Sequence, residues 1–329
     1  MMKRVKKGAL LALAALFLAA CAPGQAGDSR VLSGTVGGAS QPVLSAPAPP
    51  LTEDTEEKAP LQCLYYERDL FMAGMAAPCD YQDDRKPVAA IVPHHLLAAD
   101  MLSGFFALAA QHQYDTVVVL APSHYPQQCG SYIVTSDRDW RTPFGTVETD
   151  TALVDTLLKD GLVAAENNAA ALEYDHGGAG LVPYIAHYLP DAKVAVCLVS
   201  VQAAEKRMEA LRQHLFEYAE SGNVLLVASA DFSHYQQPEV AAVYDAATQR
   251  SIEAFDYDTI SAYSSKNVDS PQALTAFLKA VAHFDADLVQ LGHSSSPEKI
   301  AAGISNPIFE AGITTYFVYA GFLDAADGM

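Results

Sequence analysis

Three stretches of the chain share one pattern, an apolar run of strand length that ends in polar residues. The three runs are predicted strands at 88–94, which ends at His94 and is followed by His95, at 116–122, which leads to His124, and at 224–230, which leads to Asp231 and His234. Parallel strands of one sheet end at a common edge, where open α/β sheets bind their ligands. The pattern therefore predicts that these side chains lie in one crevice.

Segments with a helical spacing of apolar residues separate these runs. Helices are predicted at 96–111, 150–159, 177–188, 203–220, 238–255 and 271–283, and further strands at 131–135, 193–200, 286–292 and 314–322. Residues 140–145 are interpreted as a turn-rich loop, and Ser270 with Pro271 as the start of a helix. The repeated β-α-β order predicts an α/β fold, a single domain with a mainly parallel or mixed central sheet flanked by helices.

The first residues have the features of a bacterial lipoprotein signal. A basic segment precedes the apolar stretch from Gly8 to Ala20, and Leu18-Ala-Ala-Cys21 resembles a lipobox, in which the cysteine receives the lipid. An ordinary signal peptide is the alternative. We therefore expect a signal peptide at 1–21, a flexible Pro/Ala/Ser-rich and acidic tether at 22–60, and a folded domain at 61–329. The protein would then be lipid-anchored in the bacterial cell envelope, on the outer or the cytoplasmic membrane.

Charge and cysteine content narrow the functional classes. The net charge is −19, and no basic stripe interrupts the acidity, so no nucleic-acid partner is expected. The chain has no Cys-x-x-Cys pair, which argues against a cysteine zinc site. Outside the cytoplasm disulfides persist, and Cys63 with Cys79 is the pair that we expect.

Several of the polar residues are suited to a metal or acid/base site. Asp231 and His234 lie three residues apart just after a strand, where a carboxylate can orient an imidazole. His176 lies among glycines near a predicted helix start. Each also has a plain structural reading, such as a helix cap for Asp231, but one shared site explains His94, His124 and these residues together.

The order of these motifs resembles the Memo family, whose bacterial members are called AmmeMemoRadiSam system protein B. The similar motifs are Pro93-His94, Leu120–His124, Trp140–Gly145, Asp175-His176 with Val182–Tyr184, and Ser229–Tyr235, and the resemblance covers about residues 61–323. It implies a fold like that of class III extradiol dioxygenases, which hold Fe(II) with two histidines and a carboxylate. Memo proteins keep a related pocket of two histidines and one cysteine, linked to copper binding and redox activity.

Residue by residue, the resemblance matches His94 and His124 to the two pocket histidines, and Asp231 and His234 to the family's Asp-x-x-His. His176 matches the histidine of Glu-His-Ser, although this chain has Asp-His-Gly. Two further departures are evident. Pro-His-Ala-Gly-Tyr is here Pro-His-His-Leu-Leu, and the family's Cys-Gly aligns with Asp269-Ser270, so that a carboxylate replaces the thiolate.

This replacement suggests a specific hypothesis. Two histidines and a carboxylate suit Fe(II), whereas cysteine favours softer ions. We expect His94, His124 and Asp269 to bind a divalent transition metal, with Fe(II) favoured over Cu or Zn, and His234, Asp231 and His176 to serve catalysis. The alternative for Asp269 is support of the helix that begins after Ser270.

Two functions remain open from the sequence, beside a third reading in which the site is degenerate and is kept only as a scaffold. The first is an envelope lipoprotein with metal-dependent redox or dioxygenase-type activity. The second is a non-catalytic lipoprotein, accessory to a radical-SAM-associated system, that binds an unknown small molecule or protein partner in the same crevice.

Overall fold

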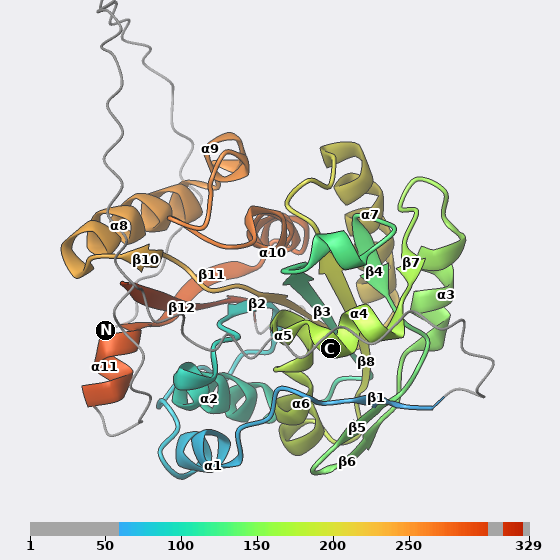
Figure 1. Ribbon diagram of the computed structural model, residues 1–329, viewed down its shortest axis with the longest axis horizontal. Coiled ribbons are helices and arrows are strands. Elements are labelled where there is room, and N and C mark those ends of the chain that lie inside the picture. Colours follow the sequence, from blue (N-terminus) through green and yellow to red (C-terminus); the bar gives the residue numbers. More distant parts are fainter. Residues whose placement is uncertain (1–58, 302–311, 325–329) are drawn as a thin grey trace, which may run out of the picture. The chain divides into compact units, whose positions relative to one another are not determined.

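Four parallel strands form the centre of the sheet, in the order β2 (Pro87–Val92), β9 (Val224–Ser229), β3 (Thr116–Pro122) and β8 (Lys193–Val199) (Figure 1). The computed structural model describes residues 59–301 and 312–324. The four strands are almost entirely buried. Near-continuous apolar runs are typical of parallel strands that are covered on both faces.

Antiparallel pairing extends this sheet at both edges. β12 (Ile313–Phe322) pairs with β2 and also with β10 (His234–Gln236) and β11 (Asp287–Ser295). At the other edge β4 (Ile133–Thr135) pairs antiparallel with β8, and β7 (Glu166–Asn167) then pairs parallel with β4. Within the described residues the sheet has nine strands. The predicted α/β fold with a parallel or mixed sheet is confirmed.

A second, three-stranded sheet corrects the prediction of a loop at 140–145. It contains β1 (Leu61–Gln62), β5 (Trp140–Thr142) and β6 (Gly145–Val147). The Pro-Phe-Gly turn has the composition of a loop, but the residues beside it form an antiparallel hairpin. Trp140 is only 1% exposed, because the small sheet packs its indole into the core.

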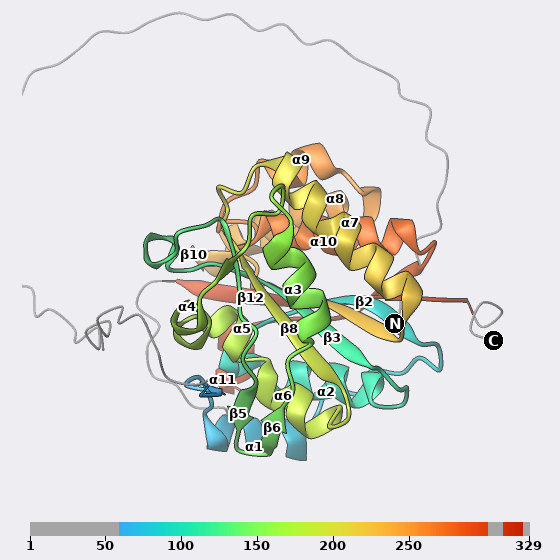
Figure 2. The same cartoon turned by 90° about the vertical axis from the view of Figure 1, so that its right-hand side faces the viewer.

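Helices cover both faces of the large sheet (Figures 1 and 2). One face is covered by α1 (Arg68–Ala76), α2 (Ala99–Ala109), α4 (Ala169–Tyr174), α5 (His176–Ala179) and α6 (Val182–Tyr188). The other is covered by α3 (Thr151–Lys159), α7 (Glu205–Ser221), α8 (Pro238–Ala254), α9 (Tyr257–Ser261) and α10 (Pro271–His283). The remaining described helical segments are the 3₁₀ turns η1 (Leu96–Ala98) and η2 (Pro126–Gln128) and the helix α11 (Ser296–Ala301). Among the described residues, none of the helices combines the length and apolarity that a membrane span requires.

Alternation along the central strands divides the interior into two cores. Val117 and Val119 of β3 pack into the core on the α2 and α6 side. Val118 and Leu120 pack into the core beneath α3, α7 and α10. Successive strand residues point to opposite faces, so one apolar run supplies both layers.

Side-chain caps fix where the helices near the functional residues begin. Asp175 accepts a hydrogen bond from the Gly177 N–H at the start of α5. Ser270 Oγ accepts one from the Ala273 N–H at 3.2 Å, and Pro271 is the first residue of α10, as the sequence predicts. Since these caps satisfy backbone N–H groups that have no helical partner, they place His176 and Asp269 at helix starts.

The expected disulfide between Cys63 and Cys79 is wrong, because both residues are free thiols in the structure. Cys63 follows β1, and its N–H bonds the Arg141 carbonyl of the small sheet. The Cys79 thiol instead lies 3.5 Å from an Asp100 carboxylate oxygen on α2. Closeness in sequence therefore does not bring these two sulfur atoms together.

A glycine on α5 gives a test of how this helix packs. A Cβ at Gly178 would lie 2.7 Å from a Val196 methyl of β8, whereas a Cβ at Gly161 would meet nothing within 4 Å. We expect Gly178→Ala to lower the free energy of unfolding by about 1–3 kcal/mol through overpacking. Gly161→Ala should stay within about 0.5 kcal/mol of the parent. Denaturant unfolding of both variants checks this, and equal stability would contradict the close packing of α5 on the sheet.

Candidate metal centre

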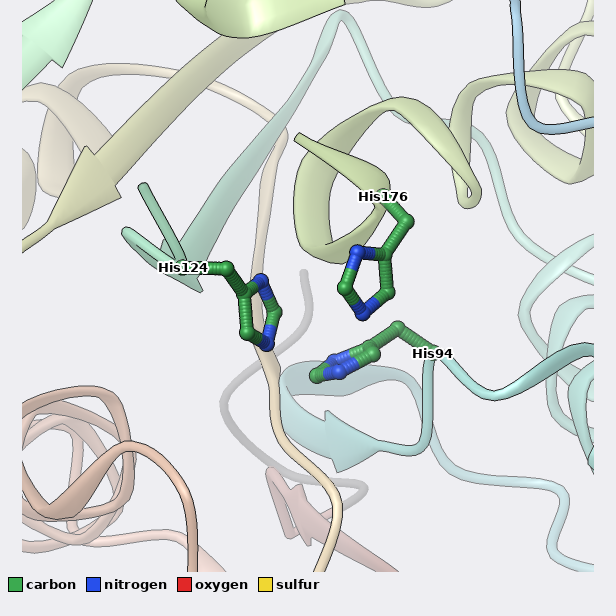
Figure 3. A group of neighbouring side chains, drawn as sticks. All are labelled: His94, His124 and His176. Carbon is green, nitrogen blue, oxygen red and sulfur yellow. The ribbon is translucent and has the colours of Figure 1, made fainter. Parts of the chain in front are cut away.

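Three histidines from three separate elements converge at the edge where the central strands end (Figure 3). His94 follows β2, His124 follows β3, and His176 begins α5. The ring centroids of His94 lie 5.2 Å from those of His124 and 5.3 Å from those of His176. His124 and His176 stack with centroids 4.0 Å apart. One ring nitrogen from each lies within 4.8 Å of the others, so the three could hold a metal ion.

The buried His94 ring is oriented by a chain of two hydrogen bonds. Its Nδ1 lies 3.1 Å from Ser229 Oγ, and Ser229 Oγ lies 2.5 Å from the Gly177 carbonyl. A carbonyl only accepts, so the single hydroxyl proton of Ser229 goes to Gly177. Ser229 must then accept from Nδ1–H of His94. The neutral imidazole therefore keeps its lone pair on Nε2.

His124 is held in the same tautomer by a buried carboxylate. Asp175 Oδ1 lies 2.7 Å from His124 Nδ1, and Asp175 Oδ2 accepts the His124 backbone N–H at 2.7 Å. Asp175 also receives the Gly177 N–H at 3.0 Å. A histidine that donates one nitrogen to a carboxylate presents the other, with raised basicity, to a metal. Nε2 of both His94 and His124 is therefore left without a proton and can donate its lone pair to a metal.

Burial favours the neutral forms of His94 and His176. It lowers the pKa of His94 well below its ordinary value, and the neighbouring His124 and His176 add to the shift. Burial, followed by repulsion from His124, lowers the pKa of His176 to about 4. Clustered imidazoles cannot share a confined volume as cations. Neutral rings are the form that binds a metal.

Two carboxylates approach His94 from the other side. Its Nε2 lies 3.3 Å from Asp269 Oδ2 and 3.5 Å from Asp231 Oδ2, and these three residues form a second group whose donor atoms lie within 4.8 Å of one another. Burial and the charge of Asp231 raise the pKa of Asp269 well above its ordinary value. Asp269 Oδ1 is a buried atom without a hydrogen-bond partner. The lone pair on His94 Nε2 faces these two carboxylates and is repelled by their oxygens. A proton or a cation between the three groups would remove this repulsion.

The backbone around these carboxylates is closely tied. Asp231 Oδ1 accepts the N–H groups of His94 at 3.1 Å and His95 at 3.4 Å. The Asp231 N–H bonds Asp269 Oδ2 at 3.2 Å, and the Asp269 N–H bonds the Asp231 carbonyl at 3.0 Å. Asp231 thereby joins the His94 loop to the segment that carries Asp269.

His234 lies next to these residues but in neither group of donor atoms. Burial lowers its pKa, and the charge of Asp231 opposes the shift. Its Nδ1 is buried without a hydrogen-bond partner. The next residue, Tyr235, has a φ of 54°, which is strained for a bulky residue. Such strain near a polar cluster is typical of functional loops.

Five of the six predicted metal-ligand and catalytic residues thus fall into two sets that share His94, and His234 belongs to neither. His124 and His176 belong to one, and Asp231 and Asp269 to the other, so His124 and Asp269 do not share a set. Sequence reasoning missed the orienting roles of Asp175 and Ser229, and also Tyr316, whose hydroxyl lies 2.9 Å from His95 Nδ1. The positions of Ser229 at a strand end and of Asp175 beside His176 were the available signals.

Comparison with known proteins places the chain in a family. Residues 69–297 match the model of the Memo-like protein family. A MEMO1 family protein of Saccharolobus islandicus is 25% identical over 177 residues, which cover 51% of this chain and 60% of the relative. One from Pyrobaculum arsenaticum is 27% identical over 167 residues, covering 49% and 58%. The chain thus spans about 60% of the length of these curated relatives.

A solved structure resembles the chain more distantly. The crystal structure of an uncharacterized protein from Escherichia coli K12 aligns with a TM-score of 0.46 at 12% identity, and it covers 72% of this chain and 99% of its own. The family assignment depends instead on the sequence match, which extends over most of the chain. The chain belongs to the Memo-like protein family.

Proposed function

We propose that this member of the Memo-like family is an envelope lipoprotein that binds a divalent transition metal and uses it in redox or dioxygenase-type chemistry. The observation that carries the proposal is the position of His94. This buried imidazole belongs to both groups of potential metal-binding residues, and its Nε2 faces the two carboxylates. A purely structural histidine does not need two groups of metal-binding residues around one buried ring.

The residues fit a bound cation. Buried polar atoms are normally satisfied, yet Asp269 Oδ1 has no partner. Two neighbouring buried carboxylates repel each other, and a divalent ion would remove that repulsion and the need for a proton on Asp269. The residues behind the histidines also fit a metal, since Ser229 and Asp175 already hold His94 and His124 in the tautomer that can bind one.

The carboxylate favours Fe(II) as the metal. His94, His124 and Asp269 would then supply the two-histidine, one-carboxylate donor set that suits this ion, and because His124 and Asp269 lie in different groups around His94, binding would have to draw these two groups together. Cu or Zn would bind better with His176 as the third ligand, because nitrogen donors suit these ions. When bound, the metal would act as a Lewis acid with open positions for a small molecule.

His234 and Asp231 are suited to move a proton beside such a metal. Burial leaves His234 as a neutral imidazole, which can accept a proton, and its buried Nδ1 is free of competing partners. The Asp231 charge favours the imidazolium that would result, which makes the acceptor more effective. His176 stacks on His124. It would either orient His124 as a metal ligand or bind the metal itself in place of another ligand.

The location at the membrane follows from Cys21. This residue and the tether after it lie outside the described residues, so the proposal is supported by the lipobox sequence alone. A lipid on Cys21 would hold the domain at the surface of the cell envelope, where it would meet an unknown small molecule or protein partner. Lipid anchors keep proteins on one side of a membrane without a spanning helix.

Metal analysis of purified protein tests the ligands. We expect His94→Ala to abolish binding, because both donor sets lose their shared imidazole, and Asp269→Ala to weaken Fe(II) binding by about tenfold or more. His283→Ala is the matched control, since that imidazole lies far along α10 and bonds Glu220. Normal loading of Asp269→Ala together with loss in His176→Ala would show that the three histidines are the ligands. Normal loading of His94→Ala would contradict the metal site itself.

The tautomers can be tested without metal. Long-range ¹H–¹⁵N spectra of the metal-free protein should show the Nδ1–H form for both His94 and His124, because Ser229 and Asp175 accept those protons. Ser229→Ala should shift the His94 signals and leave those of His124 unchanged. Nε2–H signals for His94 in the parent protein would mean that its lone pair does not face the carboxylates.

Labelling with a fatty acid tests the anchor. The parent protein expressed in a bacterium should incorporate labelled palmitate and sediment with membranes, whereas Cys21→Ala should do neither, because the acceptor sulfur is absent. Cys197→Ala, at a buried position of β8, controls for nonspecific labelling. Label in the Cys21→Ala protein would exclude this cysteine as the lipid attachment point.

A further inference from the structure

The buried face of α8 carries a row of polar residues where an apolar row is expected. Asp245, Thr248 and Ser251 recur every three residues along the helix and are 4%, 0% and 8% exposed. We call these three residues the polar stripe. A helix that covers a core usually presents a hydrophobic face. Buried polar groups are costly unless they are hydrogen-bonded, so the partners of the stripe define its purpose.

Asp245 holds the segment that carries Asp231 and His234. Its Oδ1 accepts the hydroxyl proton of Ser233 at 2.7 Å and that of Thr315 at 2.8 Å. Its Oδ2 lies 3.0 Å from Nε2 of His293. Ser233 is itself fully buried between the two functional residues, and its backbone also pairs with Thr315 of β12. One carboxylate on α8 thus fixes this segment against the sheet.

Thr248 and Ser251 hold the segment that leads to Asp269. The Asn267 side-chain amide donates to Thr248 Oγ1 at 3.1 Å, and the Tyr263 hydroxyl donates to Ser251 Oγ at 2.7 Å. Asn267 is buried and lies two residues before Asp269. The backbone of this segment contains no long regular element, because α9 ends at Ser261 and α10 begins at Pro271. Side-chain hydrogen bonds to α8 therefore supply the order that regular structure does not.

The two segments meet only a few residues from these hydrogen bonds. Phe232 and Val268 form an isolated antiparallel bridge, and the His234 N–H bonds the Ser265 carbonyl at 2.9 Å. Asp231 and Asp269 come directly beside that bridge. Their separation, and their distance to His94, depend on how the two segments are placed relative to each other.

We propose that the polar stripe of α8 positions the two carboxylates of the metal centre, with Asp245 setting the Asp231 segment and Thr248 with Ser251 setting the Asp269 segment. None of the three stripe residues belongs to either group of potential metal-binding residues, so they are positioning residues. The inference builds on the proposed metal site and adds what holds its oxygen ligands in place. Metal ligands must be held within about half an ångström of their working positions. Loss of a hydrogen bond from the polar stripe should therefore weaken metal binding although every ligand is still present.

A pair of substitutions at Thr248 separates this role from general stability. Thr248→Val keeps the volume but cannot accept the Asn267 proton, whereas Thr248→Ser keeps the hydroxyl. Ile252→Val, on the same helix and fully buried, removes a methylene group and breaks no side-chain hydrogen bond. Co²⁺ is the probe, because its visible absorption bands report the geometry of its ligands. Ser233→Ala tests the Asp231 segment in the same way.

We expect Thr248→Val and Ser233→Ala to weaken Co²⁺ binding by about 10–100-fold and to shift its absorption bands. Thr248→Ser should restore both, and Ile252→Val should lower the melting temperature while leaving both unchanged. If the parent binds Co²⁺ and Thr248→Val behaves like Ile252→Val, the positioning role is wrong.

A measurement on metal-free protein covers the case in which the parent binds no metal. The imidazole ¹H–¹⁵N signals of His94 and His234 lie beside the two carboxylates. They should shift in Thr248→Val and Ser233→Ala but not in Ile252→Val. Shifts without any metal binding by the parent would overturn the proposed function and keep the stripe as the positioning element. Unchanged signals of His94 and His234 in Thr248→Val and Ser233→Ala would contradict the positioning role of the polar stripe.

Discussion

The arrangement of the site depends on the burial of Asp231. One of its oxygens accepts two backbone N–H groups from the His94 loop, and its own N–H and carbonyl pair with Asp269. A buried carboxylate is stable only when donors surround it, so the chain must bring the ends of β2 and β9 and the start of α10 together. The positions of His94 and Asp269 therefore result from the hydrogen bonds that the buried Asp231 requires.

This constraint explains why the sheet edge is so polar while the strands are so apolar. The parallel strands bury both of their faces, and the residues just past their ends have lost the ladder that satisfied their backbone. Side chains such as Ser229 and Asp175 take over that task by bonding carbonyl and N–H groups of α5 and of the His124 loop. The same bonds leave one nitrogen of His94 and of His124 available. Stability and ligand orientation are therefore supplied by the same contacts.

The local pattern of apolar and polar residues predicted the strands and the residues at their ends, because such a pattern depends on only a few neighbouring residues. It also predicted the cap at Ser270 and the α/β order. It could not predict that β5 forms at Trp140, since its partners in β1 lie about eighty residues earlier in the chain. Nor could it reveal that Asp175 orients His124, or that Cys63 and Cys79 stay apart, because these outcomes depend on tertiary placement. The polar face of α8 is visible in the sequence only as a weakly amphipathic helix, and its meaning comes from the loops that it touches.

The two donor sets have His94 in common and differ in every other member. A change at His124 or His176 would affect only the nitrogen-rich side, and a change at Asp231 or Asp269 only the oxygen-rich side. A substitution on either flank would therefore alter the donor atoms around His94 while this central imidazole stays in place. Asp269, on the oxygen-rich side, is a position where such an exchange would leave the three imidazoles untouched.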